Sequence, residues 1–311
     1  MYTISGHHHI SMLAKSGRRT NKFYETVLGM RRVKKTVNQD DPSMYHLFYG
    51  DRTGSPGTEL TFFEMPYAGE THRGTNAITR IGLVISSEEG LSFWKQRLTK
   101  YEVPFVEGEY AQRRALLFED ADGLRLALQV EPDASLEHWE AWEDSEVPEA
   151  YQIKGMGTIE IQVRRLHKLE RTLGELFGYT VERFSNTELL LRTGKGTIFS
   201  EILAREVEGP SERPGRGSIH HLAIRVKDEE ELAYWNEQIR RRGFQTTGIL
   251  ERFYFKSVYF RESNGIMFEL ATDGPGFTID SDVDTLGQNL DLPPFLEDRR
   301  AEIEANLSPL D

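Results

Sequence analysis

Apolar and polar residues along this chain follow one order of elements that recurs. "HHHISML" and "ITRIGLVI" alternate as a β-strand does, and each is followed by a segment with helical spacing, "GRRTNKFYETVLGM" or "EEGLSFWKQRLTKYEV". Short strand patterns come after each helix and are separated by glycine-containing turns such as "RTGSPG" and "ADG". The same order restarts at "GTIEIQV" and at "SIHHLAIRV". The pattern therefore predicts four βαβββ modules.

These modules predict an α+β fold and a division of the chain. They cover about residues 5–66, 76–131, 155–206 and 216–273. The first two would form an N-terminal half, residues 1–135, and the last two a C-terminal half, residues 155–311. An acidic linker, residues 136–154, would join the halves. The segment "LPPFLEDRRAEIEANL" predicts a closing helix that begins near a proline.

Composition narrows the classes of function. The chain has 311 residues, no cysteine and a formal net charge of −12. Thiolate chemistry and cysteine-based zinc sites are therefore excluded, and nucleic acid is not an expected partner because its binding needs a basic surface. No apolar run approaches the length that spans a bilayer, so we expect no membrane partner and a cytoplasmic location. Exposed strand edges would allow a homodimer.

Histidines gather in two of the predicted strands. Five of the nine lie in "GHHHISML" and "SIHHLAIRV". His9 precedes Phe23 of its helix by 14 residues, and His221 precedes Trp235 by the same 14. Side chains alternate along a strand, so the preceding His8 and His220 should point to the opposite face and pack there. A register slip of one residue would exchange the two sets.

Three stretches carry a family resemblance: "GHHHISM" with the helix and strands that follow it, "GSIHHLAIRV", and "YFKSVYFRESNGIMFELATDGPGF". They resemble the vicinal oxygen chelate superfamily, which includes glyoxalase I, bleomycin-resistance proteins and extradiol dioxygenases. The nearest likeness is to four-module bacterial ring-cleaving dioxygenases that act on hydroquinones or catechols. The resemblance implies a metal held by His9, His221 and Glu269, from the first strand of two modules and the last strand of one.

The inner modules lack these residues at the equivalent positions. Alignment on Trp94 places Arg80 where the fourth module has His221, and Ala127 where it has Glu269. Thr158 of the third module stands where the first has His9. A single metal site therefore requires modules one and four to share one barrel-like mixed sheet, which leaves modules two and three to form the other.

Two histidines and one carboxylate form the facial triad of non-haem Fe(II) oxygenases. The expected enzyme is an extradiol-type dioxygenase that binds a small aromatic substrate and O₂, although Mn(II), Zn(II) or Ni(II) would also fit. Tyr259, ten residues before Glu269, resembles the active-site tyrosine of extradiol enzymes and is the candidate catalytic residue. Weaker candidates for the site are Tyr45, His46, Tyr254 and Arg261.

Two alternatives remain open from the sequence. Glu59, 50 residues after His9, resembles the carboxylate ligand of glyoxalase I. As a fourth ligand it would suit Zn(II) or Ni(II) in a lyase. Glu201 of the third module is expected to be structural, because no histidine accompanies it. The second alternative is a protein that binds an aromatic or a quinone without turnover.

Overall fold

The computed structural model describes residues 2–134, 137–193 and 198–310. Each module has the predicted order of elements. The first contains β1 (His7–Ala14), α1 (Gly17–Asn21) continued by the π-helical η1 (Lys22–Val27), β2 (Arg31–Val37), β3 (Tyr45–Gly50) and β4 (Glu59–Glu64). The second contains β5 (Ala77–Ile85), α2 (Glu88–Lys100), β6 (Phe105–Tyr110), β7 (Arg113–Glu119) and β8 (Arg125–Val130).

The last two modules repeat this order with shorter edge strands. The third contains β9 (Gly155–Val163), α3 (Leu166–Arg171) with η3 (Thr172–Leu176), β10 (Thr180–Arg183), β11 (Glu188–Arg192) and β12 (Glu201–Glu206). The fourth contains β13 (Ile219–Val226), α4 (Glu229–Arg241), β14 (Leu250–Glu251), β15 (Phe255–Arg261) and β16 (Met267–Pro275).

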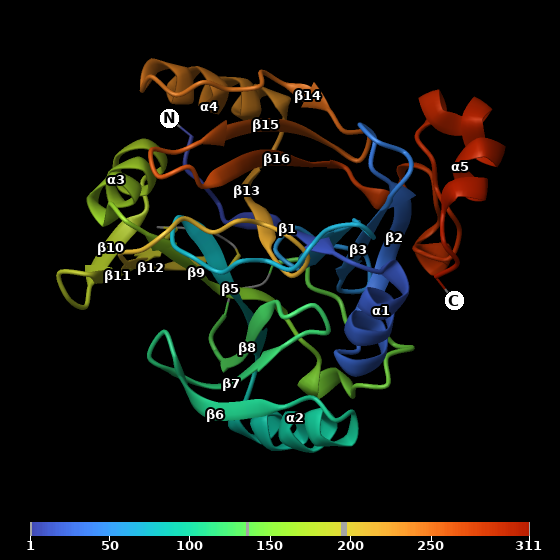
Figure 1. The fold of residues 1–311 in the computed structure, drawn as a ribbon, viewed down its shortest axis with the longest axis horizontal. Helices are drawn as coiled ribbons and strands as arrows, with labels where there is room; N and C mark the ends of the chain where they lie inside the picture. Colours follow the sequence, from blue (N-terminus) through green and yellow to red (C-terminus); the bar gives the residue numbers. More distant parts are fainter. Residues whose placement is uncertain (1, 135–136, 194–197, 311) are drawn as a thin grey trace.

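Two eight-stranded mixed sheets confirm the α+β class and the predicted pairing of modules. One sheet has the order β14-β15-β16-β13-β1-β4-β3-β2 and joins modules four and one. The other has the order β10-β11-β12-β9-β5-β8-β7-β6 and joins modules three and two. Figure 1 shows the blue first module beside the orange fourth module, with the teal second module below them and the yellow-green third module to the left.

Strand pairing at the centre of the first sheet determines where the site lies. β1 and β13 are antiparallel neighbours, with Ser11 opposite His221. β4 runs parallel to β1 on one side, and β16 runs parallel to β13 on the other. The first and last strands of modules one and four are therefore adjacent, although β1 and β13 begin 212 residues apart in sequence.

The two longer helices cover the outer faces of their sheets. Ser87 caps the N-terminus of α2 by accepting a hydrogen bond from Gly90 N, and Asp228 caps α4 in the same way through Glu231 N. Each helix buries a tryptophan, Trp94 in α2 and Trp235 in α4. Within the described residues no helix combines the length and apolar character that crossing a membrane requires.

The segment between the halves and the C-terminal segment both lie against the sheets. The expected boundary at residues 135 and 136 falls outside the described residues, so the division into halves stays a prediction. After it, Glu140 N donates to Asp51 Oδ2 at 2.9 Å. The C-terminal segment contains η6 (Pro294–Arg299), which begins at a proline as expected, and α5 (Arg300–Asn306). Ile303 of α5 packs in one apolar cluster with Val37 of β2.

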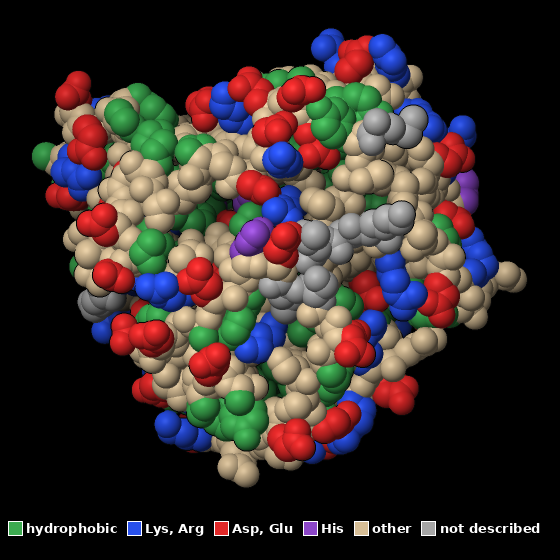
Figure 2. Space-filling model, turned by 180° about the vertical axis from the view of Figure 1, so that it is seen from behind, with side chains coloured by type: hydrophobic (Ala, Val, Ile, Leu, Met, Phe, Trp, Pro, Cys, Tyr) green, Lys and Arg blue, Asp and Glu red, His purple; other side chains and the backbone are tan. Residues whose placement is uncertain are grey.

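The surface carries charges of both signs. On the face drawn in Figure 2, basic and acidic side chains are interspersed and hydrophobic side chains form small separate groups. This distribution agrees with the acidic net charge and gives that face no basic stripe of the kind that binds phosphate backbones.

Candidate metal centre

His9, His221 and Glu269 meet at the centre of the first sheet. Glu269 Oε2 lies 2.7 Å from His221 Nε2 and 3.1 Å from His9 Nε2. The two Nε2 atoms are 3.4 Å apart. The side chains come from β13, β16 and β1, and all three residues are buried, with exposed fractions of 3, 0 and 2%. The structure thus brings together the three residues that the sequence analysis selected.

The donor atoms of these residues fit a single metal ion. Three atoms separated by about 3 Å occupy neighbouring corners of an octahedron whose metal–ligand bonds are roughly 2.1 Å long. Two imidazole nitrogens and one carboxylate oxygen are ligands that a divalent transition metal accepts. Among the described residues, this triad and a second group that shares His9, formed with His8 and Glu59, are the groups able to hold a metal.

The carboxylate of Glu269 is oriented by Ser257. Ser257 Oγ donates to Glu269 Oε1 at 2.5 Å, which leaves Oε2 directed at the histidines. Burial raises the pKa of Glu269, but the imidazoles of His9 and His221 outweigh burial and hold this pKa well below its usual range. Glu269 is therefore the ionised member of the triad. Burial lowers the pKa of His221, which favours the neutral imidazole that binds metals.

The prediction that His220 faces away from the site is wrong, because His220 lines the same cavity as His221, and each histidine doublet sits at a β-bulge. Between the pairs His7–Ile224 and Ile10–Leu222, β1 contains one extra residue. Between the pairs Ser11–His221 and Met12–Ile219, the extra residue is His220 of β13. A bulge interrupts the alternation of side chains, so neighbouring residues can turn to the same side.

The contacts of the doublets agree with this geometry. His8 Nδ1 lies 3.0 Å from His9 Nδ1, and His220 Nδ1 lies 2.8 Å from His221 Nδ1. His220 lines the same cavity as His221. Burial lowers the pKa of His8 to about 3 and that of His220 to about 4, so both imidazoles are neutral near pH 7.

Glu59 does not occupy the position equivalent to Glu269. Glu269 pairs with Ala223, two residues after His221. Two residues after His9 is Ser11, and it pairs with Thr61 of β4. Thr61, not Glu59, is therefore the structural equivalent of Glu269 in module one.

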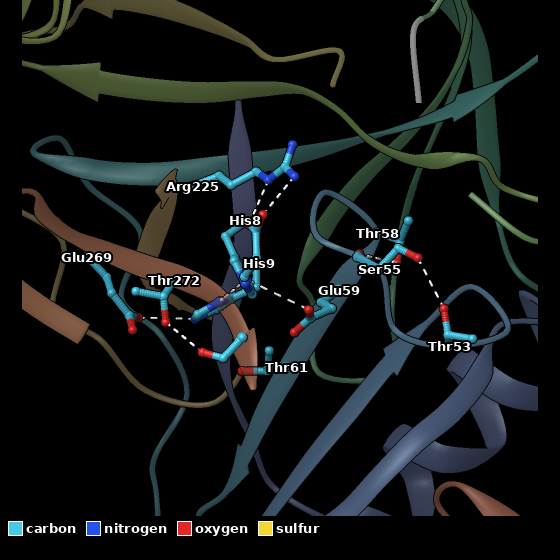
Figure 3. A network of polar contacts seen from close by, with 12 residues as sticks. His8, His9, Thr53, Ser55, Thr58, Glu59, Thr61, Arg225, Glu269 and Thr272 are labelled. Carbon is cyan, nitrogen blue, oxygen red and sulfur yellow. Dashed lines mark hydrogen bonds and ion pairs between the residues drawn. The ribbon is translucent and has the colours of Figure 1, made fainter. Parts of the chain in front are cut away.

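Glu59 lies behind His9, next to His8. Figure 3 shows Glu59 and Glu269 on opposite sides of the histidine pair. Glu59 Oε1 is 3.7 Å from His8 Nδ1, and Oε2 has no hydrogen-bond partner among the described residues. Burial raises the pKa of Glu59 well above its usual range, so this carboxyl favours its protonated form. The register of the strands places Glu59 outside the triad, which weakens the four-ligand alternative.

A cavity of about 530 Å³ opens in front of the triad. His9, His221 and Tyr259 all line it. Tyr259 pairs with Glu269 across β15 and β16, and its ring meets that of His221 edge to face at 5.5 Å. Burial raises the pKa of Tyr259, so its hydroxyl remains a hydrogen-bond donor near neutral pH.

The weaker candidates divide into two pairs. His46 and Tyr254 line the cavity, whereas Tyr45 and Arg261 are not among its lining residues. His46 stacks on Phe63 with ring centroids 4.1 Å apart, and its Nε2 is 3.0 Å from Thr61 Oγ1. Tyr254 donates its hydroxyl to Asp280 Oδ2 at 2.9 Å, so this ring is fixed by the C-terminal segment.

Sequence reasoning missed Arg252, Ser257 and the place of His220 in the cavity. Arg252 lines the cavity, pairs with Asp40 at 3.0 Å and lies over the ring of Tyr259. It belongs to a short irregular connection that carries no periodic signal. Ser257 stands two residues before Tyr259 on one strand, so period-two spacing from Tyr259 could have identified it.

The second sheet has an ion-pair cluster where the first has the triad. Thr158 Oγ1 donates to Glu201 Oε2 at 2.9 Å. Arg113 and Arg192 pair with the same carboxylate at 2.8 and 2.6 Å. Arg80 donates to the carbonyl of Leu126 at 3.2 Å. Glu201 is thus bound by two arginines, in keeping with the structural role expected for it.

Comparisons with known proteins agree with this fold. Residues 6–128 match the model of the Glyoxalase/Bleomycin resistance protein/Dioxygenase superfamily. The chain is 45% identical to "Putative ring-cleaving dioxygenase MhqA" of Bacillus subtilis (strain 168), over 99% of both chains. It is 28% identical to the chlorohydroquinone/hydroquinone 1,2-dioxygenase of Sphingobium indicum, over 96% of this chain and 95% of that protein.

Solved structures show the same architecture. A crystal structure titled "putative dioxygenase" from Bacillus subtilis superposes with a TM-score of 0.93 at 32% identity, over 100% of this chain and 99% of that one. Glyoxalase I from Zea mays has a TM-score of 0.63 at 12% identity, over 86% of this chain and 92% of that one, so it shares the fold alone. The chain belongs to the glyoxalase/bleomycin resistance protein/dioxygenase superfamily, and its full-length relatives include proteins named ring-cleaving dioxygenases.

Proposed function

We propose that this protein is a metal-dependent ring-cleaving dioxygenase for a hydroquinone- or catechol-type ring. In this proposal His9, His221 and Glu269 hold Fe(II). The observation that carries the proposal is the convergence of their three donor atoms within 3.4 Å of one another at the wall of an aromatic-lined cavity. Full-length relatives named ring-cleaving dioxygenases support it.

A bound Fe(II) would supply neighbouring open positions for a ring hydroxyl and O₂, and a path for electrons from ring to O₂. The same ligands would also accept Mn(II), and Zn(II) or Ni(II) would bind without that redox chemistry. One ring C–C bond next to a hydroxyl-bearing carbon breaks, and both atoms of O₂ enter the product as a carboxylic acid and a carbonyl group. The ring loses four electrons and O₂ gains them.

Side chains of the cavity would position the substrate and move protons. Tyr259, whose hydroxyl stays protonated, would donate a hydrogen bond to an oxygen atom of the substrate. His220 and His46 line the same cavity, and their neutral imidazoles would hydrogen-bond to a ring hydroxyl. Arg252 stacks over Tyr259 and would fix the orientation of that ring.

The alternatives receive less support from the geometry. A lyase with four ligands needs Glu59 in the position that Thr61 occupies. A protein that binds without turnover would not need three buried metal donors on three strands. The cytoplasmic location and a homodimer stay predictions.

Oxygen consumption tests the proposal. Protein reconstituted anaerobically with Fe(II) should contain one metal ion per chain. It should consume O₂ when hydroquinone or catechol is added. The variants His9→Ala and Glu269→Gln should lose both the metal and the uptake, whereas His138→Ala, at an exposed histidine, should keep both. Full uptake by the triad variants would refute the proposal.

A further inference from the structure

The cavity in front of the triad is much larger than one aromatic ring. Its volume is about 530 Å³. An apolar cavity of about 150 Å³ is enough to hold benzene. Cavities in the range of the one seen here bury ligands the size of a drug molecule. A dihydroxylated ring bound at the triad would therefore leave most of this cavity unfilled.

The additional space extends along β1 and β4, away from the triad. His9, Ser11 and Leu13 share one face of β1 and line the cavity. Four residues of strand place Leu13 about 13 Å beyond His9. On the neighbouring β4, Phe63 and Met65 line the cavity at the same end, since Leu13 pairs with Phe63.

The opposite wall of this space is also apolar. β16 pairs antiparallel with β15 and parallel with β13, and β13 runs antiparallel to β1. Met267, two residues before Glu269, therefore lies toward the same end as Leu13, and it lines the cavity with Met44. We call Leu13, Met44, Phe63, Met65 and Met267 the apolar arm. Each of the five is only partly buried, so each has apolar surface that a ligand could cover.

Charged side chains of the cavity lie outside the apolar arm and are paired. Arg252 binds Asp40 at 3.0 Å, and the carbonyl of Arg252 accepts a hydrogen bond from Gln39 at 2.7 Å. An anionic substituent would have to break the Arg252–Asp40 pair, whereas an apolar one would need no charged partner. Three of the five residues of the arm are methionines, whose flexible side chains adapt to alkyl or aryl groups.

Resting on the proposed function, we infer that the substrate is a dihydroxylated ring with a large apolar substituent. The ring hydroxyls face the triad, and the substituent, an aryl group or an alkyl chain of about six carbons, occupies the apolar arm. Each methylene that the arm buries should raise kcat/KM about fourfold. Unsubstituted hydroquinone would be a poor substrate of the same centre.

The test compares kcat/KM of the Fe(II)-loaded protein for hydroquinone, methylhydroquinone, phenylhydroquinone and hexylhydroquinone. We expect the phenyl compound to exceed hydroquinone by about 100-fold and the hexyl compound by roughly 1,000-fold or more, since six methylenes contribute about fourfold each. Met65→Trp, which fills the arm, should lower the ratio of hexylhydroquinone to hydroquinone. Val106→Trp, at an exposed position of the other sheet, should leave this ratio unchanged. Equal values for all four compounds, or a ratio that Met65→Trp does not alter, would overturn the inference.

The experiments distinguish failure of the dioxygenase proposal from failure of the apolar arm. If no compound causes O₂ uptake, the dioxygenase proposal fails, and anaerobic calorimetry with the same metal-loaded protein then tests the arm alone. Hexylhydroquinone should bind far more tightly than hydroquinone, and Met65→Trp should remove the difference. Equally weak binding of both compounds would refute the apolar arm as a substituent site.

Discussion

His9 and Glu269 are 260 positions apart in sequence, yet His9 Nε2 lies 3.1 Å from Glu269 Oε2. The antiparallel pairing of β1 with β13 and the parallel pairing of β13 with β16 produce this contact. The metal centre therefore forms only when modules one and four pair in one sheet. A substitution that weakens the contact between His9 and Glu269 should weaken metal binding.

Ser257→Ala should lower metal affinity about 10- to 100-fold, because hydrogen bonds to ligand carboxylates orient them. Ser257 Oγ holds Glu269 Oε1, and without it the carboxylate can rotate away from the histidines. Ser257→Thr keeps a hydroxyl and should restore most of the affinity. Competition with a metal chelator measures the change, with Ser43→Ala, at an exposed serine, as control. Unchanged affinity in Ser257→Ala would show that Glu269 needs no such support.

Tyr259→Phe should lower kcat about 100-fold or more while metal content stays unchanged. The hydroxyl is the only group removed, and the contact of the ring with His221 remains. Steady-state O₂ uptake together with metal analysis separates the two effects. Tyr67→Phe, at a fully exposed tyrosine, serves as control. A Tyr259→Phe protein with the kcat of the parent would remove Tyr259 from the chemistry.

Glu59→Gln distinguishes the ring-cleaving enzyme from a four-ligand lyase. Glu59 lies beside His8, and its raised pKa favours the protonated form, which glutamine mimics. We expect the variant to bind one metal per chain and to retain most of its O₂ uptake, whereas Glu269→Gln loses both. Loss of metal in Glu59→Gln, together with parent activity on a methylglyoxal–thiol adduct, would favour the lyase.

The pairing of the modules could be predicted from the sequence because a single metal site restricts which modules can share a sheet. His9, His221 and Glu269 could form one site only if modules one and four shared a sheet, and Thr158 and Arg80 showed that the inner modules lacked the ligands. The bulge between His7 and Ile10 and the bulge at His220 could not be predicted, since strand alternation assumes regular pairing and a bulge depends on the register of the partner strand.

Other parts of the site depend on contacts that local patterns do not encode. The association of Arg252 with Asp40 and with Tyr259 joins a loop of module one to module four. The size of the cavity depends on which side chains of eight strands, β1 to β4 and β13 to β16, line it. Neither property follows from periodicity along one segment.

The stability of the fold should depend on pH through Asp120. This carboxyl accepts hydrogen bonds from Leu124 N and from the hydroxyl of Tyr24, and burial raises its pKa from 3.8 to about 6. The folded protein keeps this proton up to about pH 6, whereas the unfolded chain loses it near 3.8. The stabilisation by Asp120 is therefore complete below pH 3.8 and is lost as pH rises through 6.

Asp120→Asn removes this titration while keeping an oxygen for the backbone donors. Between pH 4.5 and 7.5 the free energy of unfolding of the parent should fall relative to that of the variant, by on the order of 2 kcal/mol. Denaturant unfolding at several pH values measures the difference. Parallel pH profiles of the two proteins would mean that Asp120 has the same pKa in the folded and unfolded chains.

Isotopic labelling of the product tests the central claim most directly. The Fe(II)-loaded protein is given a substituted hydroquinone under labelled dioxygen, and mass spectrometry follows the ring-opened product. We predict that both labelled oxygen atoms enter the product of the parent protein and that Glu269→Gln forms no such product. Complete recovery of the substrate without ring-opened product from the metal-loaded parent would contradict the account. A product that lacks the two labelled oxygen atoms, or equal labelling by Glu269→Gln, would contradict it as well.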